Sequence, residues 1–188
     1  DWTVAGMAKV VAKAVTEMAG HPVVLVGHSM GGAVALEAAR LLDRIAGVIL
    51  VDTFVIPYGD LGEEQAREIE QPFYTDFASA IGGLVDNFTG AGASHTRKQK
   101  MKADMASANP EEMLPLWSDL LRWSPEAAFS DLQVPVAAIN GDMIPEPARQ
   151  RCRPHVHEYH LDGAGHFPQF EMPDRFHDTL HRALREMN

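Results

Sequence analysis

The sequence predicts an α/β protein built on a parallel sheet, and three observations lead to that class. Two short apolar runs, residues 23–26 and 45–51, have the length and the branched side chains of buried strands. The segment between them, residues 33–42, is rich in Ala and Leu, as helices are. A strand, a helix and a second strand in this order form a βαβ unit, whose two strands run parallel.

The junction between the first strand and the helix, residues 27–32, has the sequence G-H-S-M-G-G. The pattern G-x-S-x-G between a strand and a helix is typical of a nucleophile elbow, which holds its serine in a strained conformation at the carboxyl edge of the sheet. We expect Gly27 and Gly31 to leave room for the strand and the helix to approach each other. The helix N-terminus near Met30 would face an oxyanion formed beside Ser29. The alternative is that Ser29 only caps the helix.

The spacing of apolar residues predicts the elements of the core that remain. Residues 4–18 carry them at three- and four-residue intervals, which predicts a helix before the first strand. Residues 134–140 and 156–161 predict a third and a fourth strand. Pro173 opens a final helix with one apolar face.

The long stretch between the second and third strands contains no convincing strand. Its apolar stripes predict helices over residues 63–71, 73–88, 95–107 and 110–123. We therefore divide the chain into an α/β core, residues 1–54 and 133–188, and a helical insertion, residues 55–132.

The composition excludes several classes of partner. The net charge of −10 and the lack of a basic patch argue against nucleic acid and anionic membranes as partners. No apolar run approaches the roughly 20 residues that span a bilayer, and no signal peptide is visible, so we expect no membrane span and a cytoplasmic location. The single cysteine, Cys152, excludes an internal disulfide, and we expect it to be a passive thiol despite the arginines near it.

Ser29 would need a base to act as a nucleophile. His166 is the best candidate, because it follows the last predicted strand in a mobile loop after Gly163-Ala164-Gly165. The imidazole would in turn need an acid to fix its tautomer, and both Asp52 and Asp142 end predicted strands. His28, next to the serine, is expected to point away from the site and to serve in packing.

The remaining histidines do not predict a metal site. No set of carboxylates or cysteines completes a site around His155, His157 and His160, and the same holds for His177 and His181. We expect neither a metal nor another cofactor.

Four motifs together resemble the α/β-hydrolase superfamily, in particular its esterase-like and lipase-like members with a helical cap. They are the elbow at residues 27–32, the strand 47–52, the segment 134–136 and the histidine loop 163–167. The resemblance covers nearly the whole chain and implies that residues 55–132 form the cap.

The same resemblance implies that the four strands are the last four of eight, and that the N-terminal strands are lacking. One oxyanion-hole amide would be lacking with them, which leaves the amide of Met30. The elbow strand would then present an exposed edge through which the chain could associate with a partner.

The resemblance also bears on the acid. The family usually places the acid three residues after a glycine that follows the seventh strand, and Ile144 stands there. Haloalkane dehalogenases place it after the sixth strand, where this chain has Asp52, so Asp52 is favoured and Asp142 remains the alternative. Their nucleophile is an aspartate, whereas this chain has Ser29, so dehalogenation is not implied.

As a function, the resemblance implies a serine hydrolase that cleaves a small, fairly apolar carboxylic ester through an acyl-enzyme without a cofactor. Ser29 would be the nucleophile, His166 the base, and Asp52 or Asp142 the acid. Other reactions of the superfamily stay open, namely C–C bond hydrolysis, amide hydrolysis and cofactor-free haloperoxidation. A non-catalytic binding protein or an inactive fragment on the same fold is a further alternative.

Overall fold

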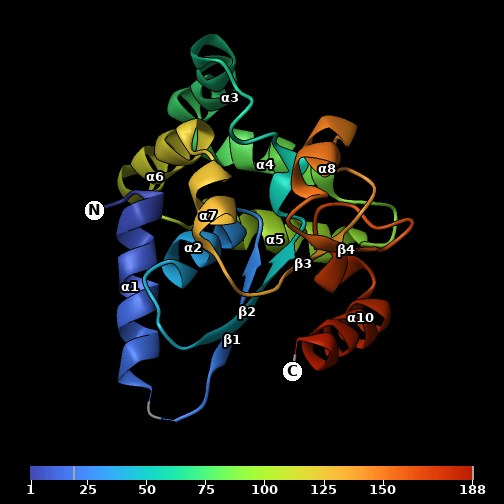
Figure 1. Cartoon of the computed structure of the whole chain (residues 1–188). Helices are drawn as coiled ribbons and strands as arrows, with labels where there is room; N and C mark the ends of the chain where they lie inside the picture. The colour runs from blue at the N-terminus through green and yellow to red at the C-terminus, as the bar shows by residue number, and fades with distance from the viewer. Residues whose placement is uncertain (19, 188) are drawn as a thin grey trace.

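The computed structural model of the chain describes residues 1–18 and 20–187 and contains a four-stranded sheet (Figure 1). The strands are β1 (Val23–His28), β2 (Ile45–Val51), β3 (Val136–Asn140) and β4 (His157–His160). They lie in the order β1-β2-β3-β4, and every neighbouring pair is parallel, which confirms the predicted fold class. The carboxyl ends of all four strands therefore lie at the same end of the sheet. β1 is an outer strand of the sheet, and its Val26 is exposed.

Helices cover both faces of the sheet because β2 alternates its apolar side chains between them. Leu50 faces the side where α2 (Met30–Ala39) packs and α1 (Val4–Glu17) lies against α2. Ile49 faces the other side, where α10 (Pro173–Glu186) supplies Phe176 to the core. Burial on both faces explains why the sequence of β2 is a continuous apolar run and does not alternate between apolar and polar residues.

A group of helices connects β2 to β3 and lies beyond the carboxyl edge of the sheet (Figure 1). It consists of α3 (Glu63–Thr75), α4 (Phe77–Phe88), α5 (His95–Ala106) and α6 (Pro110–Arg122), and we refer to these four as the inserted helices. The short helices η1 (Thr53–Val55) and α7 (Glu126–Asp131) flank them. No strand occurs among the described residues of this connection, as the sequence predicts.

One break inside the inserted helices differs from the prediction of a single helix over residues 73–88. The chain is extended at Asp76, so Phe73 belongs to α3 and Phe77 begins α4. The Asp76 carboxylate accepts the backbone N–H of Ser79 at 3.0 Å and caps the new helix. An N-cap of this kind stabilises a helix start at a point that apolar spacing alone does not mark.

Two further short helices, α8 (Glu146–Cys152) and α9 (Pro168–Glu171), precede and follow β4. Burial raises the pKa of the Cys152 thiol to about 12, and the nearby Arg151 offsets only part of that effect. The thiol is therefore protonated at neutral pH, in agreement with a passive role. Among the described residues, no helix is both long and apolar enough to cross a bilayer.

Candidate active site

Ser29 lies in the tight turn between β1 and α2. Its backbone has φ 51° and ψ −123°, a conformation that costs free energy for any residue other than glycine. The turn is held from both sides, since the Ser29 N–H donates to the carbonyl of Val51 and its carbonyl accepts the N–H of Gly32, each at 2.9 Å. The strained elbow that the motif predicts is thus present.

The glycines of this turn differ in how much space a side chain would have at each position. A Cβ on Gly27 would lie 2.2 Å from the carbonyl oxygen of Gly31, so the expectation for Gly27 is confirmed. A Cβ on Gly31 would meet open space, so the expectation that this residue makes room is wrong. Gly32 makes room for a different neighbour, because its Cβ would lie 1.9 Å from the hydroxyl oxygen of Thr53 in η1.

Ser29, His166 and Asp52 form a continuous chain of hydrogen bonds. The Nε2 atom of His166 is 2.9 Å from the Ser29 hydroxyl, and its Nδ1 atom is 2.7 Å from a carboxylate oxygen of Asp52. His166 is 4% exposed and Asp52 is fully buried. Since the carboxylate accepts from Nδ1–H, Nε2 is left to accept the serine proton.

Asp52 follows β2 directly and has a left-handed backbone, with φ 47° and ψ 41°. Its N–H donates to the carbonyl of Ile139 at 3.0 Å, and its second carboxylate oxygen accepts the N–H of Gly141 at 2.8 Å. The end of β3 therefore fixes both the backbone and the side chain of Asp52, which directs the remaining oxygen at His166.

Asp142 lies outside this arrangement. One of its carboxylate oxygens is 2.8 Å from Nε2 of His160, and the other accepts the N–H of Gly163 at 2.9 Å. The bond from Gly163, with a contribution from His160, holds the pKa of Asp142 below its usual range. The structure thus brings Asp52, and not Asp142, to His166.

The expectation that His28 points away from the site is wrong. Its Nε2 atom is 2.7 Å from the carbonyl oxygen of His166, and the two rings lie 4.8 Å apart. A carbonyl only accepts, so Nε2 of His28 carries a proton. Burial, together with the neighbouring His166, lowers the pKa of His28 to about 4 and keeps it neutral at pH 7. As the last residue of β1, His28 lies at the sheet edge, where a side chain can contact the loops above it.

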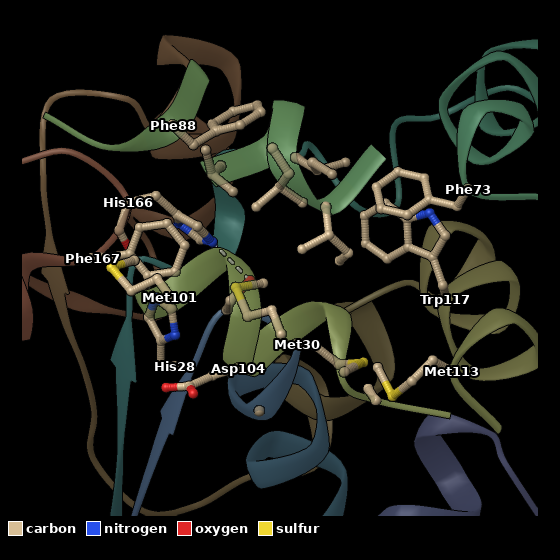
Figure 2. A pocket seen from close by; sticks show the side chains of 18 of the residues that line it. His28, Met30, Phe73, Phe88, Met101, Asp104, Met113, Trp117, His166 and Phe167 are labelled. Carbon is tan, nitrogen blue, oxygen red and sulfur yellow. Dashed lines mark hydrogen bonds between the residues drawn. The ribbon is translucent and has the colours of Figure 1, made fainter. Parts of the chain in front are cut away.

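A cavity of about 460 Å³ opens above Ser29, between the turn, the His166 loop and the inserted helices. Figure 2 shows Phe88 and Phe167 beside His166, while Phe73 and Trp117 lie at the opposite end. Apart from Ser29 and the two histidines, most of the lining is aliphatic, aromatic or methionine. Asp104 is the charged exception, and it is exposed and paired with Lys100 at 2.6 Å.

Two residues next to His166 were not among the site residues that the sequence predicts. The position of His28 directly before the serine is a signal for it, whereas strand alternation predicts that its side chain points away. Glu171 lies five residues after His166 and is buried, with backbone N–H groups as its partners. Contacts to backbone atoms leave no trace in side-chain patterns, so the sequence does not reveal them.

The described residues contain no group of three or more His, Cys, Asp or Glu side chains placed to hold a metal ion. The histidines at positions 155, 157 and 160 instead contact Phe129, Tyr159 and Asp142, respectively.

A parallel sheet with a strained serine after one strand and a histidine after the last strand defines the class of the α/β hydrolases. The sequence matches the alpha/beta hydrolase family over residues 1–179, and the chain belongs to this family. A search of curated protein sequences finds no significant match.

Several solved structures share the fold. An esterase from Exiguobacterium antarcticum has a TM-score of 0.86 and 15% identity, over 98% of this chain and 74% of that chain. A bromoperoxidase from Bacillus anthracis has a TM-score of 0.85 and 18% identity, over 98% and 75%. A thermophilic esterase from Thermogutta terrifontis has a TM-score of 0.79 and 26% identity, over 98% and 73%. At these identities the similarity shows a shared fold. Two of the three proteins are esterases.

Proposed function

We propose that the chain is a serine hydrolase that cleaves a small, fairly apolar carboxylic ester through an acyl-enzyme. The observation that carries this proposal is the hydrogen-bonded series from Ser29 through His166 to buried Asp52 at the floor of an apolar cavity. The esterases among the similar structures support the choice of ester over other substrates.

The proposed reaction uses the three side chains in sequence. The Ser29 oxygen forms a bond to the ester carbonyl carbon while its proton passes to Nε2 of His166, and Asp52 stabilises the resulting imidazolium. The Met30 N–H, at the start of α2, donates to the developing oxyanion. The bond from the carbonyl carbon to the alcohol oxygen then breaks, and the alcohol leaves with the proton held by His166.

Water completes the cycle by the same route. His166 accepts a proton from water as the water oxygen attacks the acyl carbon. The bond to the Ser29 oxygen breaks, and the proton returns to that oxygen. The products are a carboxylic acid and the free enzyme, with no cofactor required.

We propose that residues 55–132 act as a cap that shapes the substrate pocket. Side chains from all four inserted helices line the cavity, among them Phe73, Ile81, Met101 and Trp117. An aromatic and aliphatic lining favours apolar acyl and alcohol groups, because their burial removes apolar surface from water.

Hydrolysis of 4-nitrophenyl butyrate tests the proposal. We expect turnover by the parent chain, and we expect Ser29→Ala and His166→Ala each to lower kcat by at least about 10⁴-fold. Hydrolysis by Ser29→Ala at the parent rate would contradict it.

A further inference from the structure

Glu171 is a buried carboxylate close to His166. Its hydrogen-bond partners are backbone N–H groups, including those of the two residues that flank His166. Glu171 ends α9 and is 6% exposed. Its two oxygens accept three backbone N–H groups: Gly165 at 2.7 Å, Phe167 at 3.1 Å and Gly90 at 3.1 Å. A buried carboxylate is costly unless such bonds compensate its lost hydration, and bonds to a charged acceptor are about twice as strong as neutral ones.

These three donors belong to two segments that are far apart in the sequence. Gly165 and Phe167 flank His166 on the loop after β4, whereas Gly90 follows the end of α4, one of the inserted helices. The same two segments are joined directly, because the N–H of His166 donates to the carbonyl of Phe88 at 2.7 Å. The end of α4 and the histidine loop are therefore held as one unit by Glu171.

The packing around this unit leaves little room for movement. A Cβ on Gly165 would lie 2.3 Å from the backbone nitrogen of Gly90, and a Cβ on Gly90 would lie 2.4 Å from a carboxylate oxygen of Glu171. The glycine at position 165 therefore allows the loop and α4 to approach closely. The sequence suggests a mobile loop here, whereas the contacts tie it to its surroundings.

We propose that Glu171 is a positioning residue for His166, and that it makes the placement of the imidazole depend on the placement of the inserted helices. The inference rests on the proposed function, since it assigns to Glu171 a part in the reaction of Ser29. His166 must stay within hydrogen-bond distance of both Ser29 and Asp52, and a misplacement of about 1 Å in an active site can lower a rate by about 10²-fold. Glu171 restrains the peptides on both sides of His166 against such a shift.

The isosteric variant Glu171→Gln tests this role with little change in shape. The amide keeps one acceptor oxygen but directs N–H groups at one or more of the three donors. We expect kcat for 4-nitrophenyl butyrate to fall by about tenfold or more, with KM within about twofold of the parent value. Glu186→Gln is the matched control, because it removes a carboxylate that accepts the Tyr159 hydroxyl on the far side of the core. We expect this control to retain the parent kcat.

The pH profile separates a positioning role from a merely structural one. The titratable side chains next to His166 are Asp52 after β2, His28 at the end of β1 and Glu171 in α9. If Glu171→Gln weakens the contact between His166 and Asp52, the imidazolium is less stabilised, and the low-pH limb of the kcat profile moves to lower pH. The lost negative charge of Glu171 moves the limb in the same direction, so the limb is also measured in Gly90→Ala, which keeps the carboxylate. A loss of stability alone would act in the opposite direction. The folded chain is less stable in acid because of His28, so the active fraction would fall there first and the limb would move to higher pH.

Gly90→Ala tests the dependence on α4 from the other side, without altering the carboxylate. Its Cβ would lie 2.4 Å from a carboxylate oxygen of Glu171 and 2.8 Å from the backbone nitrogen of Gly165, so it would displace the unit formed by Glu171 and the histidine loop. We expect a fall in kcat and a movement of the low-pH limb in the same directions as in Glu171→Gln. This variant also keeps the proposal testable if Glu171→Gln fails to fold.

Active-site titration of each folded variant with a fluorophosphonate distinguishes a failure of the role of Glu171 from a failure of the proposed function. A labelled parent together with variants whose acid limb does not move overturns the role of Glu171 and leaves the proposed function intact. An unlabelled folded parent overturns the proposed function, and the role of Glu171 with it.

Discussion

Asp52 and Asp142 both follow strands of one sheet, and at the residue scale they differ in burial and in hydrogen-bond partners. Asp52 is buried and bonds to Nδ1 of His166, while Asp142 is half-exposed and bonds to His160. An acid that fixes a tautomer must contact the imidazole directly. The geometry therefore supports Asp52 in the proposed reaction.

Asn substitution at the two positions tests this choice. We expect Asp52→Asn to lower kcat by about 10³–10⁴-fold, because the amide no longer selects the tautomer with a proton on Nδ1. Asp142→Asn is the matched control and should keep kcat within about threefold. The measurement is steady-state ester hydrolysis, and a larger loss in Asp142→Asn than in Asp52→Asn would reverse the assignment.

His28 predicts a particular dependence of stability on pH. Its pKa is about 4 in the folded chain, whereas a free histidine side chain has a pKa of 6.5, so between these pH values the unfolded chain binds a proton that the folded chain does not. The free energy of unfolding therefore falls as pH is lowered from about 6.5 to 4, by about 2 kcal/mol from this residue.

His28→Gln removes the titrating group while it keeps an N–H donor for the carbonyl of His166. In urea unfolding at pH 7 and pH 4.5, we expect the variant to lose about 2 kcal/mol less than the parent over this interval. Equal losses in the two proteins would show that the environment of His28 does not disfavour its charged form.

At the scale of elements, the turn between β1 and α2 depends on the close approach of α2 to η1. Thr53 is fully buried in η1, and its hydroxyl oxygen lies where a Cβ on Gly32 would have to be. Overpacking of this kind typically costs about 1–3 kcal/mol.

Gly32→Ala should accordingly lower the free energy of unfolding by about 1–3 kcal/mol, as measured by urea unfolding. Adding Thr53→Ala removes the two nearest atoms and should recover part of the loss. Gly31→Ala provides the control, because its Cβ meets open space within the same helix, and we expect no loss of stability. Equal losses at positions 31 and 32 would contradict this account of the turn.

The elements and the turn were largely predictable from the sequence, because each depends on local patterns. The apolar run at residues 45–51 is β2, and the G-x-S-x-G pattern marks the elbow. The break at Asp76 was not predicted, since the apolar stripe continues across it. His28 and Glu171 were also missed, because their contacts join segments far apart in the sequence and involve backbone atoms.

At the scale of the whole molecule, the inserted helices set the size of the cavity above Ser29. Trp117 lies at the end opposite His166 in Figure 2 and closes that end together with Phe73. Each buried methylene contributes about 0.8 kcal/mol, so kcat/KM should rise with acyl chain length until the cavity is filled.

Trp117→Ala lengthens the cavity, so we expect the acyl chain length of maximal kcat/KM to increase in a series of 4-nitrophenyl esters. Trp2→Ala is the control, because Trp2 is partly exposed at the chain terminus and does not line the cavity. An unchanged optimum in Trp117→Ala would mean that the acyl group does not extend to this end.

The central claim is that Ser29 is an activated nucleophile, and intact-mass analysis after treatment with a fluorophosphonate tests it most directly. We predict one adduct on the parent chain, localised to Ser29, with none on Ser29→Ala and none on His166→Ala over the same period. The absence of an adduct on a parent chain whose circular dichroism shows it to be folded would contradict the claim.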